Sequence, residues 1–151
     1  MKKIILLITL FLVACSSQEE PVSNFEVTFL IKCDTLLGNL DKIDEIKHSL
    51  IPDNGIIYEN YALEAYEGES VFDILLRVTR DNKIHMEYVD TPIYNSAYIE
   101  GINNLYEFDA GNLSGWTYRV NDVFPNYGCS QYKVQAGDIV EWIYVYDKML
   151  F

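Results

Sequence analysis

Histidine, cysteine and proline are scarce in this chain of 151 residues, which has two, three and four of them. The histidines, His48 and His85, are far apart and lie in no recognisable motif. A zinc site needs three or four clustered Cys or His ligands, and a nucleophilic enzyme needs a base beside its nucleophile. We therefore expect solvated surface histidines and neither of these two kinds of site.

Other signatures of catalysis or cofactor binding are also missing from the sequence. There is no glycine-rich phosphate loop, and Gly111–Gly115 has the wrong spacing for a nucleophile elbow. The acidic loops at Asp53 and Asp109 lack the spacing of an EF-hand, and ordinary turn chemistry explains both. Acidic side chains are numerous enough for some pair to meet in space, but no pattern marks one. We expect a protein that is not an enzyme, with no catalytic or metal-ligating residues.

Basic residues are few, because 11 Lys and Arg face 23 Asp and Glu for a formal charge of -12. Without Lys2 and Lys3 the charge falls to -14. Phosphate binding needs clustered Lys and Arg, so the balance argues against a nucleic-acid partner and against adhesion to anionic lipid by charge alone. Acidity of this kind also keeps an exposed protein soluble.

The N-terminus has the pattern of a targeting segment. Lys2 and Lys3 precede the apolar run Ile4–Val13, which is too short to cross a bilayer that needs about 20 residues. The following Leu12–Cys15 resembles the lipobox of bacterial lipoproteins, which implies that Cys15 receives a diacylglycerol and becomes the mature N-terminus. The alternative is an ordinary secretory signal with a chance cysteine.

These patterns predict three parts: a signal peptide over residues 1–14, the lipidated cysteine and a polar tether over 15–24, and one domain over 25–151. Half of the residues are hydrophobic, which is enough for a core of ordinary size. The predicted location is the extracytoplasmic face of a bacterial cell membrane, held by a lipid anchor. The type of envelope stays open.

The domain is organised around its last third, where Gly115–Tyr146 reads as a strand, a tight turn, a short return and a long final strand. Trp116, Tyr118 and Val120 alternate with polar residues, and Asn121-Asp122 suits a two-residue hairpin turn. Pro125 ends the return or marks an edge, because proline cannot donate to a ladder. Ile139–Tyr146 is almost wholly β-branched or aromatic and is predicted to be a central strand.

The remaining elements are shorter. Alternation predicts a first strand from Phe25 to about Cys33, and Ser70 with Asp73 fits a capping pattern that opens a helix over about 69–81. We further expect a weaker helix over 40–50, strands over 56–58, 61–66 and 84–88, and a hairpin of 98–102 with 105–108 around Asn103-Asn104. The sum is an α+β fold: a small, antiparallel-rich sheet with one main helix packed on it.

The run G-W-x-Y-x-V-N-x-x-F-P-N-x-G-x-S-x-Y over 115–132, with G-D-x-V-E-W over 137–142, resembles the DUF4430 family. Residues 66–73 and 95–99 take part in the match, so that it covers most of the chain after about Phe25. Domains of this family are similar to the C-terminal domain of transcobalamin and intrinsic factor. The resemblance implies a β-grasp-like or transcobalamin-like sheet.

In transcobalamin-like families, such a domain covers one side of a corrinoid and a helical barrel covers the other. The resemblance here takes in only the sheet domain. It implies a ligand-binding module with a corrinoid of the cobalamin type as ligand, in vitamin uptake. The alternative is an envelope module that uses its aromatics or an unpaired sheet edge to hold a protein or a glycan, with no small ligand.

Two cysteines remain when Cys15 is set aside, namely Cys33 and Cys129. Outside the cytoplasm they can form a disulfide that closes a loop of about 95 residues. The alternative is a pair of buried thiols that behave as small hydrophobes.

Aromatic residues crowd the last third of the chain. Those of the strands are expected to be core, while Phe124 and Tyr127 are expected either in the core or on an exposed rim that packs on a flat ligand or a partner. The candidate ligand-binding residues are Tyr98, Tyr106, Trp116, Phe124, Tyr127 and Tyr132.

Overall fold

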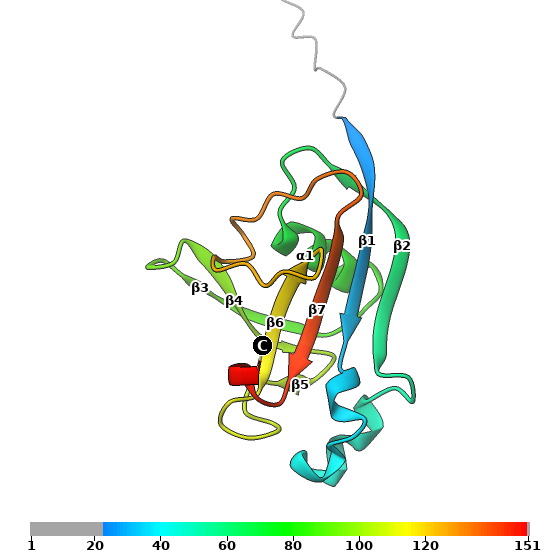
Figure 1. Cartoon of the computed structure of the whole chain (residues 1–151), viewed down its shortest axis with the longest axis vertical. Coiled ribbons are helices and arrows are strands. Elements are labelled where there is room, and N and C mark those ends of the chain that lie inside the picture. The colour runs from blue at the N-terminus through cyan, green and yellow to red at the C-terminus, as the bar shows by residue number, and fades with distance from the viewer. Residues whose placement is uncertain (1–22, 151) are drawn as a thin grey trace, which may run out of the picture.

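The computed structural model describes residues 23–150, which form two β-sheets and one α-helix around a shared core (Figure 1). The expected signal peptide, Cys15 and most of the tether lie outside the described residues. The α+β fold class is confirmed, with two sheets in place of one. The strands are β1 (Asn24–Lys32), β2 (Ile56–Tyr66), β3 (Met86–Thr91), β4 (Ser96–Ile102), β5 (Leu105–Tyr106), β6 (Gly115–Val120) and β7 (Ile139–Val145). The helices are α1 (Val71–Asp81) and the 3-10 helices η1 (Asp34–Leu36), η2 (Leu40–Lys42), η3 (Glu45–Leu50) and η4 (Lys148–Leu150).

The larger sheet has the strand order β2-β1-β7-β6. β7 is parallel to β1 and antiparallel to β6, so it has partners on both sides, and its sequence IVEWIYV suits that place. The prediction of a central final strand is therefore confirmed. Pairing the first and last strands in parallel gives the sheet the expected β-grasp-like order.

The helix α1 begins where the capping pattern predicts. The Oγ of Ser70 accepts a hydrogen bond from the backbone N–H of Asp73 at 3.1 Å, and the Asp73 carboxylate accepts one from the Ser70 N–H at 2.8 Å. The helix lies behind the larger sheet in Figure 1 and joins its core. Its buried apolar residues are Val71, Ile74, Leu75 and Val78, each worth about 1.5–3 kcal/mol of burial.

The helix predicted over 40–50 is wrong. Two 3-10 helices, η2 and η3, stand there, because Ile43 between them is extended (φ -118°, ψ 146°) and the Asp44 side chain caps the second at the N–H of Ile46. Ile46 is 80% exposed, so the apolar spacing does not form one buried stripe. The strands predicted over 56–58 and 61–66 form the single strand β2, with register shifts against β1.

Both predicted asparagine turns are present. Asn103 and Asn104 have φ of 53° and 60°, and Asn121 and Asp122 have φ of 51° and 65°, a conformation that Asn and Asp tolerate better than most residues. The first turn joins β4 to β5, which ends at Tyr106 and not at 108. The second reverses the chain after β6, but its return is reduced to one bridge, between Val120 and Val123.

The disulfide between Cys33 and Cys129 is not formed, and both thiols are free and buried. Cys33 follows β1, where its backbone N–H donates to Gly55, whereas the Cys129 thiol donates to the Ala97 carbonyl of β4 at 3.4 Å. The two residues thus belong to different parts of the core. Burial raises the pKa of the Cys33 thiol to about 12, with a smaller effect of the Asp34 charge, so the thiol stays protonated.

An ion cluster crosses the outer face of the larger sheet. Glu141 of β7 accepts from Lys32 of β1 at 2.8 Å and from the guanidinium of Arg119 of β6. Burial alone would raise the pKa of the Glu141 carboxyl, but the two cations outweigh burial and hold that pKa below its ordinary value. The carboxylate therefore ties three strands together.

Candidate functional site

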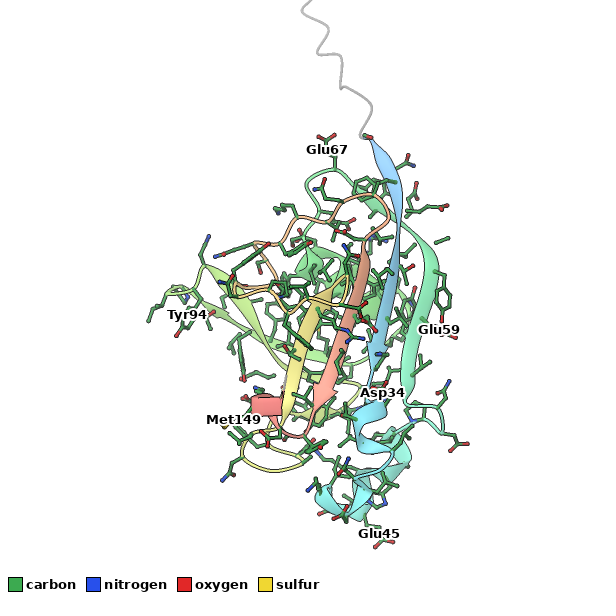
Figure 2. All side chains as sticks on the ribbon, in the orientation of Figure 1. Asp34, Glu45, Glu59, Glu67, Tyr94 and Met149 are labelled. Atoms are coloured by element: carbon green, nitrogen blue, oxygen red, sulfur yellow. The ribbon has the colours of Figure 1, made fainter. Side chains whose placement is uncertain are left out.

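A pocket of about 380 Å³ opens between β4, β6 and the loop after Pro125. Its lining is mainly aromatic and apolar, and the polar groups are few. Tyr94 comes from the tip of the hairpin that joins β3 to β4, at the margin of the molecule in Figure 2. The lining residues are Thr91, Tyr94, Ser96, Ala97, Tyr98, Ile99, Trp116, Thr117, Tyr118, Pro125, Asn126, Tyr127, Gly128, Cys129 and Trp142.

The inner wall of the pocket includes Trp116, Tyr118 and Trp142, which belong to aromatic pairs across β6 and β7. Trp116 stands opposite Tyr144 and Tyr118 opposite Trp142 in the strand register, with ring centroids 5.4 and 5.5 Å apart. The indole N–H of Trp116 donates to the Leu105 carbonyl at 2.8 Å. These contacts place the rings because alternate residues of paired strands share one face.

The indole N–H of Trp142, unlike that of Trp116, has no acceptor in the described residues. Trp142 is 2% exposed, and its Nε1 has no hydrogen-bond partner among residues 23–150. A buried donor without an acceptor costs about 1–3 kcal/mol. The side chain lines the pocket, but its Nε1 atom is closed off from solvent, so a bound acceptor would reach this donor only if the pocket wall shifted.

The loop after Pro125 forms the outer rim. Tyr127 and Tyr132 stack with ring centroids 5.8 Å apart and planes 9° from parallel, and the Tyr118 hydroxyl donates to the Tyr127 carbonyl at 2.7 Å. A second hollow, of about 600 Å³, lies on the other side of Tyr127 and includes Phe124 and Tyr132 in its lining. Tyr127 therefore stands between two hollows, and it is exposed.

The six predicted ligand-binding residues fall into three groups. Tyr98, Trp116 and Tyr127 line the pocket, and Phe124 and Tyr132 line the neighbouring hollow. Tyr106 lies elsewhere: its hydroxyl donates to Glu87 on β3 and its ring covers Gly101.

Sequence reasoning missed three aromatic residues of the pocket, namely Tyr94, Tyr118 and Trp142. Period-2 alternation placed Tyr118 and Trp142 in the core, and they are indeed buried there. No pattern in the sequence shows that this part of the core borders a pocket. Tyr94 lies two residues after Pro92 in a turn. An aromatic residue is unusual in such an exposed place, and this is the feature of the sequence that could have identified Tyr94 as a site residue.

The hydroxyl and thiol groups of the pocket remain neutral at ordinary pH. Burial raises the pKa of the Tyr98 hydroxyl, and its hydrogen bond to Glu107 raises it further. Burial likewise raises the pKa of Tyr118 and, against opposing hydrogen bonds, that of the Cys129 thiol. Each group already donates its proton to a protein acceptor, so toward a ligand it can only accept, and the shifts oppose a role as base or nucleophile.

Residues 23–150 lack two further features. No cluster of three or more His, Cys, Asp or Glu side chains has an arrangement able to hold a metal ion in that part of the chain. In the same range, no helix has the length and apolar character needed to cross a membrane.

Comparison with solved structures identifies the fold. The chain is similar to the crystal structure of haptocorrin in complex with Cbi, at a TM-score of 0.60 and 14% identity, over 88% of this chain and 28% of that one. It thus spans little more than a quarter of haptocorrin. A second match is a candidate metal-binding protein from Ruminococcus gnavus ATCC 29149, at a TM-score of 0.45 and 15% identity, over 80% of this chain and 96% of that one. The first match confirms the expected transcobalamin-like fold.

Comparison of the sequence with curated proteins finds no significant match. A family model does match: it covers residues 68–145, which are 78 of the 151 residues, and is described as a domain of unknown function, DUF4430. The matched range runs from just before α1 to the end of β7 and includes the whole pocket lining. The chain therefore belongs to the DUF4430 family.

Proposed function

We propose that this protein is a lipid-anchored, extracytoplasmic binding module that holds a corrinoid against the aromatic pocket between β4 and β6. The observation that carries the proposal is the unpaired indole N–H of Trp142, buried beside a pocket that otherwise consists of aromatic and apolar surface. Sites for small molecules have this composition, with a few polar groups that fix the ligand's orientation.

The chemistry of a corrinoid suits these surfaces. Its flat macrocycle would pack on the exposed rim aromatics, of which Tyr94 and Tyr127 are the most accessible. A pocket of about 380 Å³ is too small for the whole ligand, so one peripheral amide arm would enter it. A shift of the pocket wall would expose the Trp142 N–H, which is closed off from solvent here, and the carbonyl oxygen of that arm would then accept its hydrogen bond.

The similarity to haptocorrin, whose crystal structure contains Cbi, supports the choice of ligand class. This chain corresponds to 28% of haptocorrin, and the module would therefore cover one side of the ligand. Its affinity would accordingly be modest unless a second protein covered the other side. We therefore expect the wild-type chain alone to bind a corrinoid with micromolar and not nanomolar affinity.

Calorimetric titration of the full-length chain in detergent, with cyanocobalamin and with dicyanocobinamide, tests the ligand. We expect micromolar binding that Tyr127→Ala weakens by about tenfold, the equivalent of 1.4 kcal/mol. The matched control is Tyr61→Ala, which removes a tyrosine ring that is 69% exposed on β2, remote from the pocket lining. Absence of heat at millimolar ligand, or equal losses in both variants, would reject the proposed ligand and site.

The anchor is tested separately. Cells expressing the wild-type chain should incorporate labelled palmitate into it and retain it in the membrane fraction, whereas Cys15→Ser should abolish both. Membrane retention of unlabelled Cys15→Ser would show that the chain is held by something other than a lipid on that cysteine.

A further inference from the structure

The outer edge of β6 carries backbone groups that no described residue satisfies. Val120 exchanges both backbone hydrogen bonds with Val123, at 2.9 and 3.0 Å, so its N–H and C=O point away from β7. Backbone groups two and four residues earlier point the same way along a strand. The N–H and C=O of Tyr118 and Trp116 therefore face the open edge, and β7 is the only strand paired with β6 among residues 23–150.

Pro125 explains why this edge stays open. With Val120 opposite Val123, a longer return strand would place residue 125 opposite Tyr118. Proline has no N–H, so it cannot donate to the Tyr118 carbonyl, and the chain leaves the ladder there. The loop instead turns outward toward Tyr127, and the hollow beside β6 remains.

The opposite edge of the same sheet is protected by its own side chains. On β2, the Asn60 side chain accepts from the Ala62 N–H at 3.0 Å, and Arg77 of α1 donates to the Glu64 carbonyl at 2.8 Å. Figure 2 shows the exposed Glu59 on the same strand, at the margin remote from Tyr94. Proteins commonly cover or charge the sheet edges that must not pair with another chain. The two edges of this sheet therefore differ, since the β2 edge is protected and the β6 edge is open.

The edge of β6 is flanked by a hollow on each face. Trp116 and Thr117 line the pocket of about 380 Å³ and also a smaller pocket of about 200 Å³ on the other side, which includes Phe124, Val145 and Lys148. Side chains of an added strand alternate between the two faces. A strand laid along β6 would therefore place one side chain in the larger pocket and the next in the smaller.

We propose that the edge of β6 binds an extended, positively charged peptide segment of a partner protein by strand addition. Main-chain hydrogen bonds to Trp116 and Tyr118 would supply affinity, and the two pockets would select an aromatic or large aliphatic side chain at alternate positions. The formal charge of -12 favours a cationic partner by long-range attraction, which speeds encounter; the two pockets themselves contribute only Lys148 as a charged side chain. This function goes beyond corrinoid binding because it uses the backbone groups of β6, although both ligands would enter the larger pocket and would therefore compete.

A displayed library of random eight-residue peptides, selected against the full-length chain, tests the proposal. The enriched peptides are synthesised with single N-methyl groups at successive positions, and each affinity is measured by calorimetry. N-methylation at every second amide should weaken binding by about tenfold, whereas the amides between them should tolerate it, because only alternate amides of an added strand donate to β6. The enriched peptides should also carry net positive charge.

Pro125→Val closes the edge from within, since valine supplies the missing N–H and favours a strand. This variant should keep the far-ultraviolet circular dichroism of the wild type and lose peptide binding by more than tenfold. No enriched peptide, N-methyl effects without a period of two, or full binding by Pro125→Val would overturn the proposal. Corrinoid and peptide titrations are separate measurements, so either function can fail while the other stands.

Discussion

Trp116 and Trp142 form a matched pair that differs in a single hydrogen bond. Both side chains are nearly buried, both lie on the inner face of the larger sheet, and each contacts a tyrosine ring. The N–H of Trp116 reaches the carbonyl of Leu105 at 2.8 Å, whereas the N–H of Trp142 has no acceptor in the described part of the chain. Phenylalanine at either position removes the N–H and part of the ring.

Loss of the N–H should lower the unfolding free energy of Trp116→Phe and raise that of Trp142→Phe. Loss of ring volume costs either variant about 1–2 kcal/mol, and this part cancels in the comparison. Trp116→Phe removes the hydrogen bond to the Leu105 carbonyl, which costs about 0.5–1.5 kcal/mol more. Trp142→Phe removes an unsatisfied donor and recovers about 1–3 kcal/mol. Trp116→Phe should therefore be less stable than Trp142→Phe by about 1.5–4.5 kcal/mol.

Urea unfolding followed by far-ultraviolet circular dichroism measures this difference without relying on tryptophan fluorescence. A thermal midpoint at least about 3 °C lower for Trp116→Phe is the corresponding result on heating. Corrinoid titration adds a second readout, since Trp142→Phe should weaken binding about tenfold although the fold is retained. Equal stabilities would show that the Trp142 N–H is satisfied in solution, and the physical basis of the proposed ligand site would be lost.

Three further outcomes are expected. Ser70→Ala removes the cap of α1 and should lower the unfolding free energy by about 1 kcal/mol in urea titrations, and an unchanged midpoint would mean that the cap is energetically neutral. The pKa of Glu141 is lower in the folded state than its unfolded value of about 4.3, so the carboxylate stabilises the fold fully above that pH and progressively less as the pH falls below it. Glu141→Gln should therefore make the unfolding free energy depend less on pH in this range. Parallel pH profiles for the wild type and the variant would contradict the ion cluster. Peptides containing Cys33 and Cys129 should take up iodoacetamide only after unfolding without reductant, and a disulfide-linked peptide pair found by mass spectrometry would contradict the free thiols.

Local patterns predicted much of the fold because they depend on near neighbours in the chain. The cap at Ser70, the two asparagine turns and the alternation of β6 each follow from residues within a few positions of one another. The same reasoning failed for residues 40–50, where the extended backbone at Ile43 breaks a spacing that otherwise suits a helix.

The candidate site was predictable only in part. An aromatic-rich turn pointed to Phe124 and Tyr127, and both border hollows in the structure. Tyr106 also lies in an aromatic-rich segment after an asparagine turn, yet its hydroxyl donates to Glu87 of the second sheet. Residue type alone does not distinguish an aromatic ring at a pocket from one that covers a glycine.

The sequence by itself determined the family, the α+β class, the strand faces and the turns, because these rest on motif identity and on short-range backbone chemistry. Only the tertiary structure decided which parts of the chain meet. It separated Cys33 from Cys129, joined Glu141 to cations on two other strands and left the Trp142 N–H without an acceptor. Each of these depends on the register and spacing of strands far apart in the chain, where one residue of shift would move every side chain to the other face.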